Sequence, residues 1–271
     1  MYGRILRRLL RAAAQNSFAA LLVFATLAAC SSRASADPIV PPSFAVDDAA
    51  PGAGFVVPTG IAFLPDGRFF VAEKRGEVWE VRNGIKQPAP IWNAQNEVLD
   101  QHDRGLLGIA VDPNYFVNHF IYFLYTVDPD SNGNDTNDDA YARLTRYTVN
   151  FTDSTSVLAS SRTILMGYNW PSAPVSASPS HTIGALRWGR DGSLLVSSGD
   201  GAQYDFADGG GGQQTDVGAF GPGKTDPYYD IGAFRSQDIT SLNGKILRIN
   251  PANGHGYASN PFANSDLASA Q

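Results

Sequence analysis

The sequence predicts an all-β protein and, within that class, a β-propeller. Three observations lead to this prediction: one hairpin motif recurs along the chain, turn-forming and aromatic residues are abundant, and no helical periodicity follows residue 30. The chain contains 27 Gly, 17 Pro, 4 Trp, 11 Tyr and 15 Phe. This composition is typical of short strands joined by tight turns.

The recurring motif is a short apolar run, a turn rich in Pro, Asp or Gly, and a second apolar run. It begins at Gly60, at Gly108 and at Ala185, so the copies are 48 and 77 residues apart. Asp66-Gly67 and Asp191-Gly192 stand between apolar runs, and Asp-Gly in this setting is a strong signal of a β-hairpin. Second strands are expected at 69–72, 120–125 and 194–197, and third strands at 77–81, 144–149 and 245–249.

Hairpins followed by an outer strand and repeated at this spacing are typical of propeller blades, which take about 40–50 residues each before loop insertions. A β-sandwich is the alternative, but sandwiches do not usually repeat one hairpin motif in register. Residues 55–271 hold three recognisable blades and part of a neighbour, and thus three to four blades. Because a propeller needs roughly four blades or more to close, we expect this sequence to be a fragment of a longer propeller.

The first residues predict an export signal. Residues 1–29 combine four arginines, an apolar stretch from Phe18 to Ala29 and small residues before Cys30, the pattern of a signal peptide. The apolar stretch is shorter than the roughly 20 residues that a spanning helix needs. Leu27-Ala28-Ala29-Cys30 matches a bacterial lipobox, which predicts lipidation of Cys30, and residues 30–54 are expected to form a flexible tether.

Removing residues 1–29 leaves 16 Lys and Arg against 26 Asp and Glu, because all four arginines of the signal are lost with it. A net charge near −10 on the mature chain argues against nucleic acid as a partner, and the lipid anchor is the one expected contact with a membrane. We expect an exported bacterial lipoprotein of the periplasm or cell envelope, and Ser31 is compatible with the outer membrane.

An acidic loop between two expected strands has the spacing of a calcium loop. Asp128, Asp130 and Asn132 occupy positions 1, 3 and 5, a glycine follows at position 6, and Asp139 stands at position 12. These four oxygen-bearing residues are the candidate metal ligands. Asp at position 12 in place of Glu, and the absence of flanking helical patterns, leave open that the loop is simply solvated.

The motifs together resemble the glucose/sorbosone dehydrogenase family. Residues 58–81 are similar to the first blade of that family, Asp103-Arg-Gly-Leu-Leu-Gly-Ile-Ala-Val-Asp-Pro-Asn-Tyr115 to its second blade, and Ser180-His-Thr-Ile-Gly-Ala-Leu186 to the segment with its active-site histidine. Residues 237–251 resemble the strand that precedes the central Arg–Asn segment of the family. The resemblance implies a six-bladed propeller that oxidises an aldose or related sugar with pyrroloquinoline quinone (PQQ) held beside Ca²⁺.

The resemblance also assigns residues and partners. His181 takes the place of the catalytic base, and a neutral imidazole is suited to accepting a hydroxyl proton near neutral pH. Asp103, Gln203 and Asp205 take the places of cofactor contacts, although the family commonly has Gln where Asp103 stands and an acid where Ser180 stands. The implied partners are a small sugar and an electron acceptor that the sequence leaves unknown.

A second function remains open on these residues. The missing glutamines at the positions of Asp103 and Asp205, together with Ser180, also fit a non-catalytic envelope propeller that binds carbohydrate or protein. A calcium-dependent lactonase-like propeller fits the Gly105–Gly108 and Ser180–Leu186 motifs less well. We expect His102, on a charged loop, to be solvated, and the long insert at 205–234 to cover the site as a loop.

Overall fold

The computed structural model describes residues 39–133, 140–150, 152, 155–169, 172–211 and 230–263. The chain divides into two compact units, Met1–Asp48 and Ala49–Gln271. Residues 39–48 of the first unit are exposed and contain neither helix nor strand. The predicted signal segment and Cys30 lie outside the described residues. Across the described ranges, no helix combines the length and hydrophobicity required to cross a membrane.

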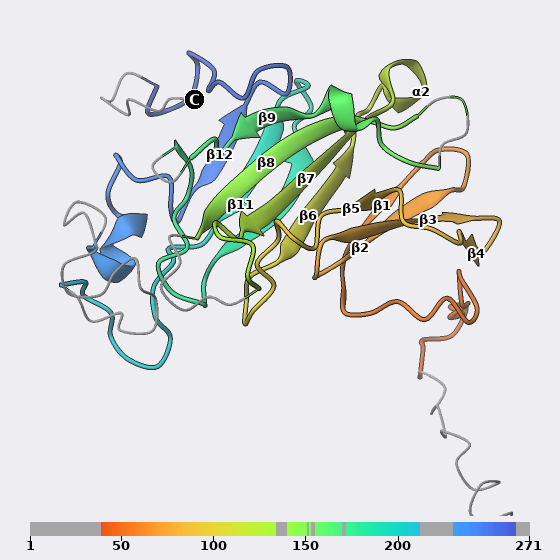
Figure 1. Cartoon of the computed structure of the whole chain (residues 1–271), viewed down its shortest axis with the longest axis horizontal. Coiled ribbons are helices and arrows are strands. Elements are labelled where there is room, and N and C mark those ends of the chain that lie inside the picture. The colour runs from red at the N-terminus through yellow and green to blue at the C-terminus, as the bar shows by residue number, and fades with distance from the viewer. Residues whose placement is uncertain are drawn as a thin grey trace, which may run out of the picture. The chain divides into compact units, whose positions relative to one another are not determined.

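The second unit contains three antiparallel sheets in sequence order (Figure 1). The first sheet consists of β1 (Pro58–Phe63), β2 (Phe69–Glu73), β3 (Glu77–Arg82), β4 (Ile85–Lys86) and β5 (Trp92–Asn93). The second consists of β6 (Leu106–Val111), β7 (Phe120–Val127), β8 (Tyr141–Thr148) and β9 (Thr163–Met166). The third consists of β10 (Ile183–Trp188), β11 (Leu194–Ser198) and β12 (Ile246–Ile249). Short helical turns are α2 (Tyr115–Asn118), η1 (Ala159–Ser161) and η4 (Gly232–Ser236).

Each copy of the sequence motif forms the first two strands of one sheet, which confirms the predicted hairpins and the all-β propeller class. In the first copy, Gly67 closes the turn with φ of 88°, and its backbone N–H donates to the Leu64 carbonyl at 3.1 Å. Gly192 has the same role in the third copy, with φ of 80°. Glycine suits both positions because it adopts positive φ without a steric penalty.

The second copy departs from this pattern. Residues Tyr115–Asn118 form one helical turn, α2, which ends at His119 in a left-handed conformation. The expectation of no helix after residue 30 was therefore wrong at this connection. The physical reason is local: the backbone oxygen of Asp112 accepts the Tyr115 N–H at 2.9 Å, and its carboxylate accepts the Asn114 N–H at 2.9 Å, so the chain turns helically before β7.

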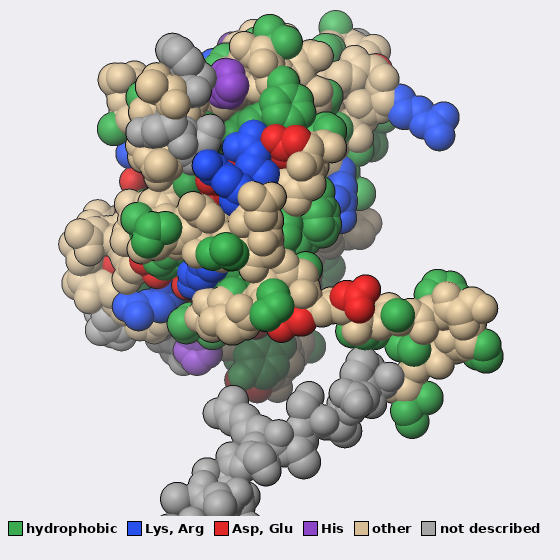
Figure 2. Space-filling model, turned by 90° about the vertical axis from the view of Figure 1, so that its right-hand side faces the viewer, with side chains coloured by type: hydrophobic (Ala, Val, Ile, Leu, Met, Phe, Trp, Pro, Cys, Tyr) green, Lys and Arg blue, Asp and Glu red, His purple; other side chains and the backbone are tan. Residues whose placement is uncertain are grey.

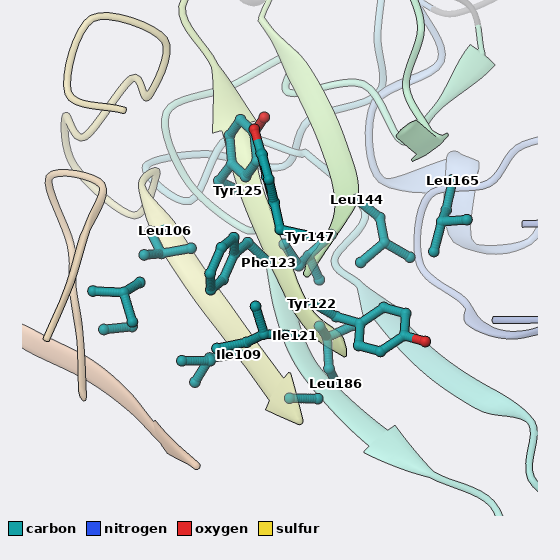
Figure 3. Close-up of a cluster of buried hydrophobic side chains, with 14 of the residues drawn as sticks. Leu106, Ile109, Ile121, Tyr122, Phe123, Tyr125, Leu144, Tyr147, Leu165 and Leu186 are labelled. Carbon is teal, nitrogen blue, oxygen red and sulfur yellow. The ribbon is translucent and has the colours of Figure 1, made fainter. Parts of the chain in front are cut away.

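The core surrounds the middle sheet, and β7 is buried along almost its whole length. Figure 3 shows side chains of β6, β7 and β8 meeting Leu186 of β10 in this cluster. Trp92 of the first sheet stacks on Phe123 with ring centres 4.4 Å apart. The middle sheet is therefore covered by apolar side chains from both neighbouring sheets, as expected for consecutive blades.

Glycines at the start of the motif allow the inner strands of neighbouring sheets to approach closely. A Cβ on Gly60 of β1 would lie 2.9 Å from a methyl carbon of Ile109 of β6. A Cβ on Gly108 of β6 would lie 2.9 Å from Leu124 and 3.1 Å from the Gly184 carbonyl oxygen of β10. This close packing brings the strand ends that carry polar residues to one edge of the sheets.

Candidate functional site

A pocket of about 590 Å³ opens where β2 and β11 end and β6 and β10 begin. Its volume lies in the range of about 300–1,000 Å³ that is usual for small-molecule sites. The polar side chains on its wall come from separate segments: Lys74, His102, Asp103, His181, Thr182, Ser197 and Ser198. The fold therefore gathers two histidines, a lysine and an acid from segments that adjoin all three sheets.

His181 lies on this wall and is paired with Asp200. The Nδ1 atom of His181 lies 3.1 Å from Oδ1 of Asp200, and the His181 side chain is about half exposed, at 48%. A carboxylate can only accept a hydrogen bond, so this contact requires the proton on Nδ1. The Nε2 atom of a neutral His181 is then the proton acceptor, which is the state needed in a general base.

The β10–β11 hairpin brings these two residues together. Its last pair is Ile183 with Ser198, so the residues beyond it, His181 and Asp200, face each other across the open end. The Gly199 N–H donates to the Thr182 carbonyl at 2.5 Å, and the Gly201 N–H donates to the His181 carbonyl at 2.9 Å. The position of Asp200 thus follows from the register of the hairpin. Asp200 was not among the residues predicted from the sequence, although Gly199-Asp200-Gly201 follows the strand directly.

Asp103 lies on the same pocket wall as His181, and its role as a cofactor contact stays a prediction. Its side chain is exposed, and its backbone joins the segment before β10: its N–H donates to the Pro179 carbonyl at 3.0 Å, and its carbonyl accepts from the Thr182 hydroxyl at 2.8 Å. These contacts hold the loop before β6 against the loop before β10. Residues far apart in sequence are thereby fixed in one pocket.

Lys74 and His102 also line the pocket, and neither was selected from the sequence. The Lys74 ammonium donates to the His102 carbonyl, and His102 has a left-handed backbone with φ of 51°. His102 is exposed, as expected from the sequence, and its exposed side chain also lines the pocket. Lys74 comes immediately after β2, a predicted strand that ends at this edge, and this position could have identified it as a candidate site residue.

Gln203 and Asp205 lie on the turn after Asp200, but neither belongs to the described residues that line the pocket. Gln203 is buried, and its side-chain oxygen accepts the Tyr204 N–H at 2.8 Å. The Asp208 carboxylate accepts the Gln203 N–H at 3.0 Å and so folds this segment back on itself. Asp205 is exposed on that turn. Their roles as cofactor contacts stay predictions.

The described half of the acidic loop is organised by its own hydrogen bonds. The buried carboxylate of Asp128 accepts the N–H groups of Ser131 at 2.9 Å and Gly133 at 2.8 Å, and Asp130 accepts the Asn132 N–H at 3.1 Å. Asp139 lies outside the described residues. Within the ranges that the structure describes, no group of three or more His, Cys, Asp or Glu side chains has a metal-binding arrangement, so calcium binding stays a prediction.

Comparisons with known proteins agree with this architecture. A family profile described as Glucose / Sorbosone dehydrogenase matches residues 55–271. An uncharacterized protein of Synechocystis sp. is 27% identical over 225 residues, which cover 80% of this chain and 46% of that protein.

Two solved structures share the fold. A PQQ-bound aldose sugar dehydrogenase of Streptomyces coelicolor aligns with a TM-score of 0.56 and 20% identity, over 82% of this chain and 53% of that one. An oxidoreductase of Thermus thermophilus, titled a putative glucose dehydrogenase, aligns with a TM-score of 0.53 and 23% identity, over 78% of this chain and 48% of that one. The chain therefore spans about half the length of these relatives, and its three sheets are consecutive blades of a β-propeller.

Proposed function

Because the chain belongs to the glucose/sorbosone dehydrogenase family, we propose that the whole protein is an oxidoreductase that oxidises an aldose or a related sugar with PQQ as the acceptor of hydride. The single observation that supports this most directly is that His181, on the wall of a pocket formed at the ends of three sheets, has its Nδ1 atom within hydrogen-bond distance of the Asp200 carboxylate. A base oriented by a carboxylate and open to solvent is the group that hydroxyl oxidation requires.

In the proposed reaction, Nε2 of His181 takes the proton of a sugar hydroxyl group while a hydride leaves the carbon that bears this hydroxyl. That carbon becomes a carbonyl carbon. Asp200 keeps the proton on Nδ1 and stabilises the imidazolium that forms. The quinone, when bound, supplies the acceptor for the two electrons of the hydride. Asp103 and Lys74 lie on the same wall, where they can orient the sugar or the cofactor.

The described wall fits a planar carboxylated quinone in volume and in charge. The pocket measures about 590 Å³, and Lys74 with His102 offers donors for quinone and carboxylate oxygens. Asp103 offers an acceptor at a position where an amide is common in the family, so it would face a donor group of the sugar rather than a carboxylate. Among the described residues, no group of three or more His, Cys, Asp or Glu side chains is arranged to bind Ca²⁺.

The test uses the full-length natural protein. PQQ is titrated into the protein, followed by its absorbance, and sugar-dependent reduction of a dye is then measured with a panel of aldoses. We expect His181→Ala to bind PQQ as the wild type does and to lose about 10²–10⁴-fold in kcat. Asp200→Asn should also bind PQQ, with a smaller loss of rate.

Two outcomes would overturn the proposal in different ways. A folded wild-type protein that binds no PQQ would favour the alternative, a non-catalytic propeller that binds carbohydrate or protein at the envelope. Full activity in His181→Ala would leave the dehydrogenase intact but remove His181 from its mechanism.

We also propose that the protein is exported and anchored through lipidated Cys30. Growth of expressing cells with radiolabelled palmitate should label the wild type in the membrane fraction. Cys30→Ser should abolish the label and release the protein, while Ser31→Ala should keep both label and location. Label retained in Cys30→Ser would contradict the anchor.

A further inference from the structure

The two largest fully buried side chains in the described structure are both arginines, Arg104 and Arg235. A buried guanidinium is costly unless hydrogen-bond acceptors and opposite charges surround it. Arg104 donates from Nε to the Ser176 hydroxyl at 2.8 Å and from Nη2 to the Ser176 carbonyl at 3.0 Å. Arg235 is placed differently, because its partners lie in the turn that carries Asp200.

The Nη1 atom of Arg235 donates to three backbone carbonyls. It lies 3.3 Å from the oxygens of both Asp200 and Gly201, and 3.2 Å from that of Gly232 in its own helical turn, η4. Burial lowers the pKa of Arg235, whereas the charges of Asp208, Asp230 and Asp200 act in the opposite direction. Arginine remains protonated in proteins, so a fixed positive charge lies directly behind the turn.

A second group of contacts holds the same turn from the following segment. The side-chain amide of Asn243 donates to the Gly199 carbonyl at 3.3 Å, and the Gly244 N–H donates to that carbonyl at 2.7 Å. The Lys245 ammonium in turn donates to the Arg235 carbonyl at 2.9 Å. Residues 235–245 therefore wrap the turn, which gives a role to a segment that the proposed reaction leaves unused.

We propose that Arg235 is the positioning residue that holds the 199–201 turn so that the Asp200 carboxylate stays on Nδ1 of His181. This inference rests on the proposed function only in naming His181 as the base. Arg235 does not line the pocket, so it acts through the turn. Without its guanidinium, the Asp200 and Gly201 carbonyls lose a shared donor, and the carboxylate loses its fixed distance to the imidazole.

The direct readout is the tautomer of His181, measured by ¹⁵N chemical shifts of its two ring nitrogens in the full-length protein without added cofactor. The wild type should show the proton on Nδ1 and a bare Nε2. Asp200→Asn and Arg235→Met should each give a mixture of tautomers, and Arg235→Lys should move the shifts back toward the wild type because it keeps the charge. Arg146→Met is the matched control: Arg146 also donates to a backbone carbonyl, that of Pro251 at 3.0 Å, and its loss should leave the His181 shifts unchanged.

Rate measurements separate this inference from the proposed function. With PQQ and sugar, Arg235→Met should retain PQQ binding and lose roughly ten- to a hundredfold in kcat, the size seen when residues that orient a functional histidine are removed. If the wild type neither binds PQQ nor oxidises sugar, the proposed function fails, and the tautomer result still decides the role of Arg235. A folded Arg235→Met with wild-type ring-nitrogen shifts would overturn the inference.

The wild-type protein gives a test that does not depend on any variant folding. The Gly201 amide bonds to the His181 carbonyl, and the Phe234 amide bonds within the turn that carries Arg235. If Arg235 holds the two segments together, both amides should exchange with solvent deuterium at the same rate under native conditions, in one opening event. Exchange of Gly201 at least tenfold faster than that of Phe234 would show that the turn opens without Arg235 and would refute the proposal.

Discussion

Gly199 shows how far the candidate site depends on a single small residue. A Cβ at this position would lie 2.1 Å from the His181 carbonyl oxygen and 2.6 Å from its carbonyl carbon. Both atoms are backbone, so no side-chain rotation can relieve the overlap. The turn that carries Asp200 can therefore reach His181 only because residue 199 has no side chain.

We predict that Gly199→Ala separates Asp200 from His181. The overlap should lower the free energy of unfolding by about 1–3 kcal/mol, and the tautomer of His181 should become mixed, as in Asp200→Asn. Urea denaturation and ring-nitrogen NMR measure the two effects. Gly192→Ala is the control: its Cβ would meet nothing within 4 Å, although φ is 80°, so we expect some loss of stability and an unchanged His181. An unchanged His181 signal in Gly199→Ala would contradict the prediction.

The candidate site residues predicted from the sequence all belong to recognisable motifs. Residues that join the site only through the folding of the chain were not predicted. His181 and Asp103 were selected through the resemblance, and the structure places them on one pocket wall, while their roles stay predictions. Asp200 was missed because its contact with His181 depends on hairpin register. Gln203 is only three residues from Asp200, but the turn closed by Asp208 takes it into a separate buried position.

The elements of the middle sheet are joined at one end by a charged network around Glu97. Its Oε1 accepts hydrogen bonds from the Tyr125 hydroxyl at 2.7 Å, from Arg143 at 2.6 Å and from Arg162. These donors come from β7, from β8 and from the turn before β9, so one carboxylate ties three elements together. Burial alone would raise the pKa of Glu97, but the hydrogen bonds from Tyr125, Arg143 and Arg162 outweigh it, and the pKa is lowered.

We therefore predict that Glu97 contributes to stability at neutral pH and that this contribution is lost in acid. Because the pKa is lower in the folded state than in the unfolded state, the contribution is fully present above about pH 4.3, the ordinary value for glutamate, and falls as the pH drops through the folded-state pKa. Glu97→Gln should cost about 1–3 kcal/mol at pH 7 and less at pH 3.

Urea denaturation of both proteins at pH 7 and pH 3 measures this difference. Glu77→Gln serves as the control, because Glu77 accepts an amide hydrogen bond from Asn93 at 3.2 Å and, within the ranges that the structure describes, belongs to no such network. An equal cost of Glu97→Gln at the two pH values would show that the network contributes through packing rather than charge.

Prediction of the elements succeeded where the hydrophobic pattern was long. The hairpin strands carry alternating or continuous apolar residues, and the structure confirms them. The strands β4 and β5 have two residues each, which is too short for any periodicity to appear. α2 was missed for a similar reason: its single turn is fixed by backbone and carboxylate contacts of Asp112 rather than by an apolar face.

At the scale of the molecule, the sheets are joined through their inner strands, and apolar side chains remain exposed on the first and the last strand of the series. Ile61 and Phe63 of β1 are exposed, and so is Ile246 of β12. Figure 2 shows hydrophobic side chains at the surface beside clustered charged ones on one face of the molecule. The repeat in sequence predicted the blades themselves. How closely they pack could not be predicted, because it depends on contacts between residues of different repeats, such as Gly108 with Gly184.

Trp188 is the clearest of these contacts between blades and supports a prediction for the whole molecule. Its indole N–H donates to the Val111 carbonyl at 2.7 Å, and its ring meets Tyr122 edge-on, with ring centres 5.4 Å apart. Trp188 ends β10, whereas Val111 and Tyr122 belong to β6 and β7. A single side chain thus couples the third sheet to the second, and His181 precedes the strand that it anchors.

Trp188→Phe should remove the hydrogen bond and cost about 1 kcal/mol, whereas Trp188→Ala should also remove the ring and cost about 3 kcal/mol or more. If the blades unfold as one unit, both variants should shift a single cooperative transition, seen alike by far-UV circular dichroism and by aromatic absorbance. Trp79→Phe in the first sheet, whose ring lies 3.9 Å from the Lys86 ammonium, tests whether loss of any tryptophan has this effect. Transitions that separate in Trp188→Ala but not in Trp79→Phe would show that Trp188 carries the coupling between blades. Coincident transitions with no change in midpoint would show that the close backbone packing at Gly108 is sufficient without it.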